Sequence, residues 1–331
     1  MKCRRCHEEA VIEVRRHRAA FCRDCFLHHC RQQVRRTIER HEMIRPGERA
    51  LVAVSGGKDS LAVWDLLLDL GHEADGVYLG LGIGDYSAES LERARAFARG
   101  REARLIEVDL GAEVGFTIPL AAERVHRSPC SACGLSKRHL LNKVAVEEGY
   151  DVLVTGHNLD DEAAVLLGNV LQWSMEYLAR QRPVLPESPG FARRVKPLVA
   201  MGERESAAYC VLRGIDYIVD ECPMAAGNRH LRYKEALNAI EEQSPGAKAT
   251  FFAGFLDNML PMLSELAVEE RAKVGTCRSC GAPTTSETCA FCRLRERAQQ
   301  DAPAKGRRRG RQHRVPDQAH AGAAPSGAGD G

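Results

Sequence analysis

Short apolar runs alternate with longer amphipathic stretches through the middle of the chain. The apolar runs predict strands at ALVAV (50–54), ADGVYLGL (74–81), ARLIEV (103–108) and YDVLVTG (150–156). Helical periodicity falls between them, near 59–70, 88–100 and 135–148. Strands that alternate with helices in this way predict an α/β fold, with a doubly wound parallel sheet covered on both faces.

The flanking segments extend this pattern. Residues 30–45 predict a basic helix that starts at Cys30 and ends near Pro46-Gly47, and the run DYIVDECPM (216–224) predicts a strand that ends at Cys222. The chain from Asp301 is rich in Arg, Gly, Ala and Pro, so we expect it to be disordered. Further helices are expected at 159–178, 203–213, 229–243 and 249–271.

The composition indicates the cellular compartment and the chemical state of the cysteines. The 331 residues are 44% hydrophobic, which is enough for a large core, but no apolar run is long enough to span a membrane. The start MKCRRCHEEA lacks the apolar segment of a signal peptide, so we expect a cytoplasmic protein with no membrane association. In that reducing compartment, the 13 cysteines indicate metal or catalytic roles rather than disulfides.

The formal charge of +2 is unevenly distributed. Residues 1–49 carry +6 and residues 301–331 carry +3, whereas residues 50–300 carry −7. Basic ends on an acidic body are typical of a protein whose ends touch a polyanion such as RNA, although they also fit solvated surfaces. The basic N-terminal residues are Lys2, Arg4, Arg5, Arg15, Arg16 and Arg18, and the tail holds KGRRRGRQHR (305–314).

Two sets of cysteine pairs have the spacing of structural zinc sites. Four thiolates complete a tetrahedral shell with no open position, so each set predicts one Zn²⁺. In the N-terminal set, His7, His28, His29 or Cys30 could replace one ligand. The sets are Cys3, Cys6, Cys22 and Cys25, and Cys277, Cys280, Cys289 and Cys292.

Three of the remaining cysteines have the character of a functional site. Cys130 and Cys133 are expected in a loop before a helix near Leu135, where the helix N-terminus lowers a thiol pKa. Cys222 is expected at the carboxyl end of a strand, where ligands bind in open parallel sheets. Cys210, in the apolar stretch SAAYCVLRG, is expected in the core.

Two loops have the character of a phosphate site. The stretch SGGKDS (55–60) follows a predicted strand and opens a helix, so its backbone N–H groups can bind an anion, but it matches neither GxxxxGK[ST] nor GxGxxG. In VTGHNLDDEA (154–163), Gly156 permits close backbone approach, and Asp160 and Asp161 can hold Mg²⁺ or cap the helix.

Together, SGGKDS, PCSxCGxxKR, GHNxDDEA and the later Cys222 resemble the TtcA/TtuA/Ncs6 family of PP-loop tRNA 2-thiolation enzymes. The zinc pairs at both ends make the zinc-finger-flanked TtuA type the nearest match, over residues 1 to about 295. The resemblance implies an adenine nucleotide α-hydrolase-like PP-loop ATPase domain. The expected regions are a zinc finger (1–30), a basic linker helix (31–47), the catalytic domain (48–272), a second zinc finger (273–298) and a disordered basic tail (299–331).

The resemblance also implies a mechanism. ATP adenylates the 2-oxygen of a tRNA uridine, and sulfur then displaces AMP. Cys130, Cys133 and Cys222 are expected to hold a 4Fe-4S cluster with one iron open for sulfur, and Cys130, Cys222, Lys137 and Asp161 are expected to be catalytic. With Mg²⁺ present, the expected ATP site comprises Ala53, Ser55, Gly56, Gly57, Lys58, Asp59, Ser60, Leu79, Lys137, Gly156 and Asp161.

Several alternatives remain at this stage. Sulfur could pass through a Cys130 persulfide, with a Cys130–Cys222 disulfide formed on transfer. The target could be the T-loop ribothymidine (position 54), which we favour, or the wobble uridine (position 34). The sulfur donor could be a ubiquitin-like thiocarboxylate carrier or sulfide, and a homodimer is expected. Other functions that we considered are a PP-loop amidotransferase or NAD-synthetase-like ligase, and a zinc-finger nucleic-acid binder with a nucleotide-sensing domain.

Overall fold

The structure is a computed structural model that describes residues 1–125, 127–225, 227, 229–263 and 274–300. These belong to one compact unit, Met1–Gln300. The predicted disordered tail and the end of the predicted helix 249–271 lie outside the described residues. Within the described part, no helix has both the length and the apolar character needed to cross a membrane.

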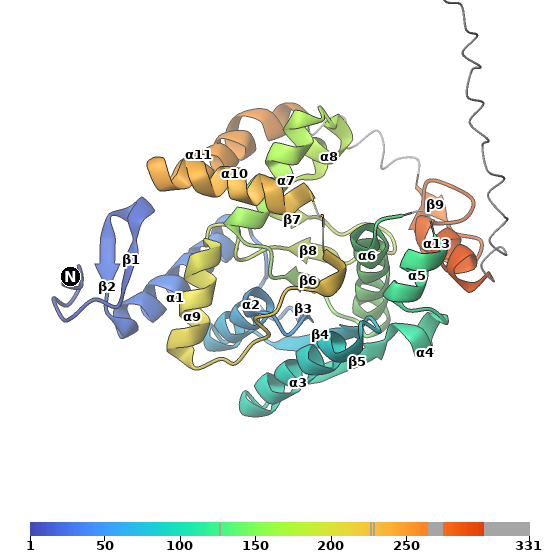
Figure 1. Ribbon diagram of the computed structural model, residues 1–331, viewed down its shortest axis with the longest axis horizontal. Coiled ribbons are helices and arrows are strands. Elements are labelled where there is room, and N and C mark those ends of the chain that lie inside the picture. The colour runs from blue at the N-terminus through green and yellow to red at the C-terminus, as the bar shows by residue number, and fades with distance from the viewer. Residues whose placement is uncertain (126, 226, 228, 264–273, 301–331) are drawn as a thin grey trace, which may run out of the picture. The chain divides into compact units, whose positions relative to one another are not determined.

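A six-stranded sheet in the order β5-β4-β3-β6-β8-β7 forms the centre of the molecule (Figure 1). Its first four members confirm the predicted strands: β3 (Ala50–Val54), β4 (Ala74–Gly80), β5 (Leu105–Asp109) and β6 (Val152–Thr155). The sequence analysis missed β8 (Arg193–Val195), which is parallel to β6, and β7 (Val184–Leu185), which is antiparallel to β8. Both are short and β8 is charged, so neither has the apolar alternation of a strand.

Helices cover both faces of the sheet, which confirms the doubly wound α/β prediction. Leu51 and Leu153 are register partners on one face, where they pack with α6 (Pro129–Glu147), α4 (Leu110–Val114) and α5 (Ile118–Arg124). Val52 and Val154 face the other side, which α2 (Lys58–Asp69) and α3 (Gly84–Gly100) cover. The α6 face also receives α13 (Ala290–Gln299), beside the small hairpin of β9 (Gly275–Thr276) and β10 (Pro283–Thr284).

The N-terminal module contains the hairpin of β1 (Ile12–Val14) and β2 (Ala19–Phe21), joined by η1 (Arg15–His17) and followed by α1 (Arg23–Arg40). The basic helix therefore begins at Arg23, directly after Cys22, and not at Cys30 as predicted. Phe26, Cys30 and Val34 recur every four residues on its buried face and are fully enclosed. Cys30 is thus a core residue of this helix.

The predicted helix 159–178 is two helices, α7 (Leu159–Leu171) and α8 (Met175–Arg180). The chain turns between them at Trp173, whose φ of 48° lies in the left-handed region that a helix does not use. The predicted helices at 203–213 and 229–243 are confirmed as α9 (Glu203–Arg213) and α10 (Arg229–Gln243). The predicted helix from 249 begins as α11 (Ala247–Gly254) and continues as a π-helical turn, η3 (Phe255–Met259).

The predicted strand ending at Cys222 is wrong. Residues 216–222 join no sheet, and a short 3-10 turn, η2 (Pro223–Ala225), follows them. Instead, this segment crosses the β3–α2 loop, where the Ile218 N–H donates to the Gly56 carbonyl at 3.0 Å. Ile218 is buried and Val219 is exposed, so the apolar residues that suggested a strand partly reflect packing against this loop.

A buried carboxylate joins three elements on the α2 face. Asp65 in α2 is 1% exposed, and it accepts bonds from the Tyr209 hydroxyl at 2.6 Å and Arg213 Nε at 2.8 Å. Arg101, just after α3, lies 2.8 Å from the same carboxylate. Asp69, one helical turn later and more exposed, contacts both arginines at 3.2 and 3.5 Å.

We predict that Asp65→Asn lowers the free energy of unfolding by about 3 kcal/mol, because it leaves two guanidinium groups without their buried counter-charge. Asp69→Asn is the matched control and should cost about 1 kcal/mol or less, since that site is solvated. Urea denaturation followed by circular dichroism measures both. Equal losses in the two variants would contradict the assigned role of Asp65.

Candidate functional site

The loop between β3 and α2 has the geometry of an anion site. The Ser60 hydroxyl accepts from the Ser55 N–H at 3.1 Å and donates to the Gly57 carbonyl at 2.8 Å, which folds the loop over the first turn of α2. Gly57 is the N-cap residue of α2. Because no side chain caps this helix, its first N–H groups remain available. This arrangement suits a phosphate.

Two glycines allow three backbone segments to meet at this edge of the sheet. Gly56 has φ 72°, and a Cβ on it would lie 2.2 Å from the Ser90 carbonyl oxygen. A Cβ on Gly156, just beyond β6, would lie 2.8 Å from the Asp59 carbonyl carbon. The glycines of the two motifs therefore bring the ends of β3 and β6 against α2 and α3.

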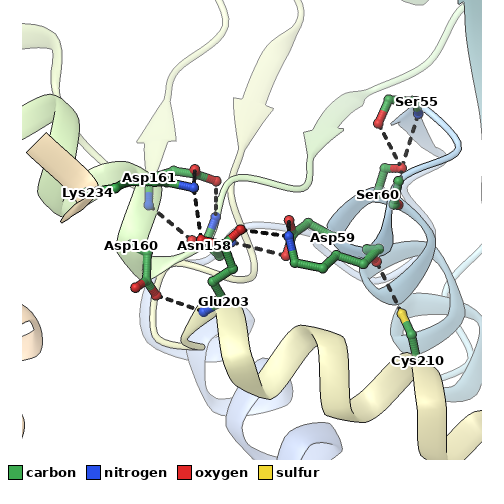
Figure 2. A network of polar contacts seen from close by, with 11 residues as sticks. Ser55, Asp59, Ser60, Asn158, Asp160, Asp161, Glu203, Cys210 and Lys234 are labelled. Atoms are coloured by element: carbon green, nitrogen blue, oxygen red, sulfur yellow. Dashed lines mark hydrogen bonds and ion pairs between the residues drawn. The ribbon is translucent and has the colours of Figure 1, made fainter. Parts of the chain in front are cut away.

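Charged side chains link the two motifs (Figure 2). Asn158 lies between Asp59 and Asp161: its amide donates to Asp59 at 3.0 Å, and its N–H donates to Asp161 at 3.2 Å. Lys58 Nζ lies 3.0 Å from Asp59 and 2.8 Å from Glu203 at the start of α9. A second lysine, Lys234 in α10, lies 2.7 Å from Asp161 and 3.1 Å from Glu203.

The two aspartates of GHNLDDEA have different surroundings. Asp161 closes a capping box with Asn158, the N-cap residue of α7. Its hydrogen bonds to the backbone therefore match the helix-capping role that the sequence allowed. Asp160 is buried, accepts from the Glu203 N–H at 2.7 Å and pairs with Lys248. Asp161 is the more accessible of the two.

The neighbours of Lys58 keep it charged, whereas burial and the neighbours of Asp59 shift the pKa of that carboxylate in opposite directions. Burial alone would lower the pKa of Lys58, but Asp59 and Glu203 raise it above its usual range. Burial would raise the pKa of Glu203, yet Lys58 and Lys234 hold it at about 2. Burial raises the pKa of Asp59 even though Lys58 and Asn158 stabilise its carboxylate.

Cys130, Cys133 and Cys222 lie at the same edge of the sheet. Helix α6 begins at Pro129, so Cys130 and Cys133 lie in its first turns and not in a preceding loop as predicted. Cys130 Sγ lies 3.6 Å from the Met224 carbonyl, two residues after Cys222, and Cys133 and Cys222 are half-buried in the same apolar cluster. The chain segment that bears Cys222 is the one that crosses the phosphate loop.

The expected lowering of their thiol pKa values is wrong for Cys130 and Cys133. Burial raises the pKa of both, and the Cys222 thiol close by raises them further, while Lys137 opposes the shift. The helix N-terminus does not outweigh this loss of solvent. Cys222 and Lys137 therefore lie within electrostatic range of both thiols.

Ala53 and Leu79, the two residues of the expected ATP site that lie on strands, share one face of the sheet. Ala53 is the register partner of Val77, and Leu79 follows two residues later on the same side of β4. Ala53 packs in the cluster that contains Leu79 and α6. Both residues therefore lie near the cysteines and beside the phosphate loop.

Each predicted zinc set converges in space. In each, the four ligand sulfurs lie within 4.8 Å of one another. Backbone N–H groups overcome the effect of burial and lower the pKa of Cys3 and of Cys277 to about 6, which favours the thiolate form that binds metal. None of the spare ligands His7, His28, His29 or Cys30 belongs to the N-terminal set; His29 instead lies near His17 and Glu205.

Sequence reasoning missed three members of the charged network: Asn158, Glu203 and Lys234. Asn158 was inside a quoted motif and its position as an N-cap residue was readable. Glu203 and Lys234 lie 45 and 76 residues beyond it in unremarkable helices, and only the packing of α9 and α10 on this edge reveals them. Cys210 is buried beside Lys58, which confirms its core prediction.

Comparison with known proteins finds similar sequences over most of the chain. Residues 2–27 match the family model of the 2-thiouridine synthetase TtuA N-terminal LIM domain. The chain is 52% identical over 294 residues to the tRNA-5-methyluridine(54) 2-sulfurtransferase of Thermus thermophilus, covering 89% of this chain and 91% of that one. It is 41% identical to the Pyrococcus horikoshii protein of the same name, with 89% and 93% covered.

A solved structure has a similar fold. The U34-tRNA thiolase NcsA from Methanococcus maripaludis, determined with its 4Fe-4S cluster, superposes with a TM-score of 0.77 at 26% identity. The similarity covers 89% of this chain and 96% of that one.

We predict that Gly56→Ala weakens ATP binding by about tenfold or more, that is about 1.4 kcal/mol, because its Cβ would collide with the Ser90 backbone and displace the loop. Gly47→Ala is the matched control, since Gly47 also has a positive φ but has open space around it. The Gly47→Ala variant therefore has the backbone strain of a positive φ but no collision of the added Cβ. Isothermal titration calorimetry with ATP distinguishes them, and equal affinities in the two variants would contradict the account.

Proposed function

We propose that this chain, which belongs to the TtcA/TtuA/Ncs6 family of PP-loop tRNA 2-thiolation enzymes, is an ATP-dependent sulfurtransferase that makes 2-thioribothymidine at position 54 of tRNA. The relatives at 52% and 41% identity carry the name of that activity. The observation that carries the proposal is the meeting of the phosphate loop, the charged network and three cysteines at one sheet edge. A uridine bound there would lie between ATP and a sulfur source.

In the first step, the uridine 2-oxygen attacks the α-phosphate of ATP, the bond to pyrophosphate breaks, and an adenylated base results. The loop Ser55–Ser60 binds the phosphates through its N–H groups and Lys58. The carboxylates of Asp59 and Glu203 hold the Lys58 ammonium in place at 3.0 and 2.8 Å. Preorganised positive charge stabilises the developing negative charge on the phosphates.

Mg²⁺ would be held with the ATP phosphates by Asp59 and Asp161. Both are carboxylates at the loop edge, and Asp161 is more accessible than Asp160, whose bonds are already made. Before a cation binds, the ammonium groups of Lys234 and Lys58 balance the negative charge of these carboxylates. Mg²⁺ supplies charge neutralisation of the phosphates when bound.

In the second step, sulfur bonds to C2 of the base and AMP leaves with the former 2-oxygen. Adenylation makes this possible because AMP leaves far more easily than an oxide. Lys137, one turn after Cys133, supplies positive charge beside the reacting atoms. Cys130 and Cys222 lie where sulfur would enter.

Cys130, Cys133 and Cys222 fit a 4Fe-4S cluster: they are three thiols, grouped and half-buried, with an apolar surround. When bound, a cluster with three cysteine ligands supplies one iron without a protein ligand, open to hydrosulfide. Burial raises the pKa of Cys130 and of Cys133, and metal binding would overcome this by deprotonating the two thiols. The structure of the U34-tRNA thiolase NcsA contains a 4Fe-4S cluster.

The two Cys₄ sets would each hold a structural Zn²⁺, and the basic residues of the N-terminal module would contact tRNA phosphates. The sulfur source would be a ubiquitin-like thiocarboxylate carrier or free sulfide, and the active form a homodimer. These are expectations from the family resemblance.

We predict that Cys130→Ser, Cys133→Ser and Cys222→Ser each reduce thiolation by about a hundredfold or more while ATP binding persists, because each removes one of three metal ligands. Cys30→Ala, a core cysteine elsewhere, is the control and should retain activity. Nucleoside mass spectrometry of tRNA after anaerobic reaction gives the rate, and comparison of 2-thioribothymidine with wobble thiouridines gives the position.

Mössbauer spectroscopy of the anaerobically purified enzyme tests the cluster itself. The account predicts a 4Fe-4S signal that the three serine variants lose. A zinc-only enzyme with full activity would support the persulfide route instead. Absence of sulfur incorporation with any donor would remove the sulfurtransferase proposal.

A further inference from the structure

Two arginines near the cysteines lack the acidic partner that their neighbours have. On β8, Arg193 pairs with Glu48, and Lys196, just after the strand, lies 2.8 Å from Glu162. Arg194 between them, and Arg138 in α6, make no hydrogen bond or ion pair with any described residue. Their positive charges are therefore available to a ligand.

Register places Arg194 on the α6 side of the sheet. Leu153 in β6 is the register partner of both Leu51 in β3 and Arg194 in β8, so the three side chains share a face. Leu51 and Leu153 pack with α6 on that face. Arg194 continues this row beyond the apolar core.

Helix α6 is fixed beside β8 by one asparagine. Asn142 donates to the Gly190 carbonyl at 2.8 Å and accepts from the Ala192 N–H at 3.1 Å. Arg138 lies four residues earlier in α6, about 6 Å toward the carboxyl edge, and Arg194 lies two residues further along the strand, about 6.6 Å the same way. The backbones of the two arginines therefore lie at matching heights, and the Arg138 charge, after burial, lowers the pKa of Arg194.

The Arg138 side chain turns back toward the cysteines. Its Nη1 would lie 3.2 Å from a Cβ on Gly134, the residue directly after Cys133. The glycine of PCSxCGxxKR thus gives the guanidinium room beside the sulfur-transfer residues. This puts the Arg138 charge beside the proposed uridine site.

An exposed tyrosine lies within electrostatic range of this charge. Tyr177 in α8 is 66% exposed and close enough to Arg138 to raise its pKa, against the effect of burial. Trp173, in the turn before α8, is 74% exposed. Exposed aromatic rings beside unpaired arginines are the combination with which proteins bind unstacked nucleotides of RNA loops.

We propose that Arg138 and Arg194 bind a backbone phosphate of the tRNA strand next to the modified uridine, and that Tyr177 stacks on an adjacent unstacked base. Arginine suits this role because its planar guanidinium donates two parallel hydrogen bonds to a phosphate. The inference rests on the proposed tRNA substrate and assigns these three as positioning residues. A phosphate could also come from ATP or pyrophosphate, so the test separates the sources.

The test measures tRNA affinity against salt, together with the KM for ATP, for full-length Arg138→Gln and Arg194→Gln. Each should weaken tRNA binding by about tenfold, reduce the slope of log K against log salt by about 1 and leave the KM for ATP unchanged. Arg99→Gln, which removes an equal charge from an exposed arginine paired with Glu92 at 2.8 Å, should change neither. Tyr177→Ala should weaken binding with an unchanged salt slope, because stacking releases no counterions.

A T-arm RNA with single methylphosphonate linkages locates the phosphate. Neutralising one linkage beside the uridine should weaken binding to the wild-type enzyme by about tenfold and have little further effect on Arg138→Gln. The proposal would be overturned by additive losses at every linkage or by unchanged tRNA affinity in the arginine variants. A raised KM for ATP with tRNA affinity intact would also overturn it. Failure of the wild-type enzyme to thiolate tRNA would instead remove the proposed function.

Discussion

The close approach of backbone segments at the carboxyl edge of the sheet is the constraint on which the site depends. Gly56 lies against the Ser90 carbonyl and Gly156 against Asp59, at distances that leave no room for a Cβ. This contact places the phosphate loop and the start of α7 side by side, so that Asn158 can reach both Asp59 and Asp161. The charges of the proposed ATP site are therefore positioned by main-chain geometry rather than by long side chains.

The same edge organises the sulfur chemistry. The segment that leads to Cys222 hydrogen-bonds to the Gly56 carbonyl, and Cys130 contacts the turn just after Cys222. The nucleotide loop and the cysteine group thus share one segment of chain. Helix α6 contributes Cys130, Cys133, Lys137 and Arg138 within nine residues, so the proposed sulfur entry, charge stabilisation and phosphate contact all lie on one helix.

Features with strong local signals were predictable from the sequence. The strands β3 to β6 are mainly apolar runs, and α9 and α10 match their predicted ranges, because strands rich in apolar residues and amphipathic helices leave clear patterns. The glycines of the two loops and the two zinc spacings were likewise readable. Features that depend on tertiary packing were not. The strand assigned to 216–222 had a suitable pattern but no neighbouring strand, and the thiol pKa values follow burial that no local pattern reveals. Lys234, Glu203 and the unpaired Arg194 gain their meaning only from the elements packed around them.

The central claim is that the uridine 2-oxygen attacks ATP at this edge and leaves with AMP. Transfer of an isotope tests it directly: a tRNA or T-arm RNA carrying ¹⁸O at the 2-position of the target base is thiolated with ATP, and the AMP is analysed by mass spectrometry. The account predicts one ¹⁸O in the phosphate of AMP for each thionucleoside formed. AMP without the label, in a reaction that still yields the thionucleoside, would contradict it.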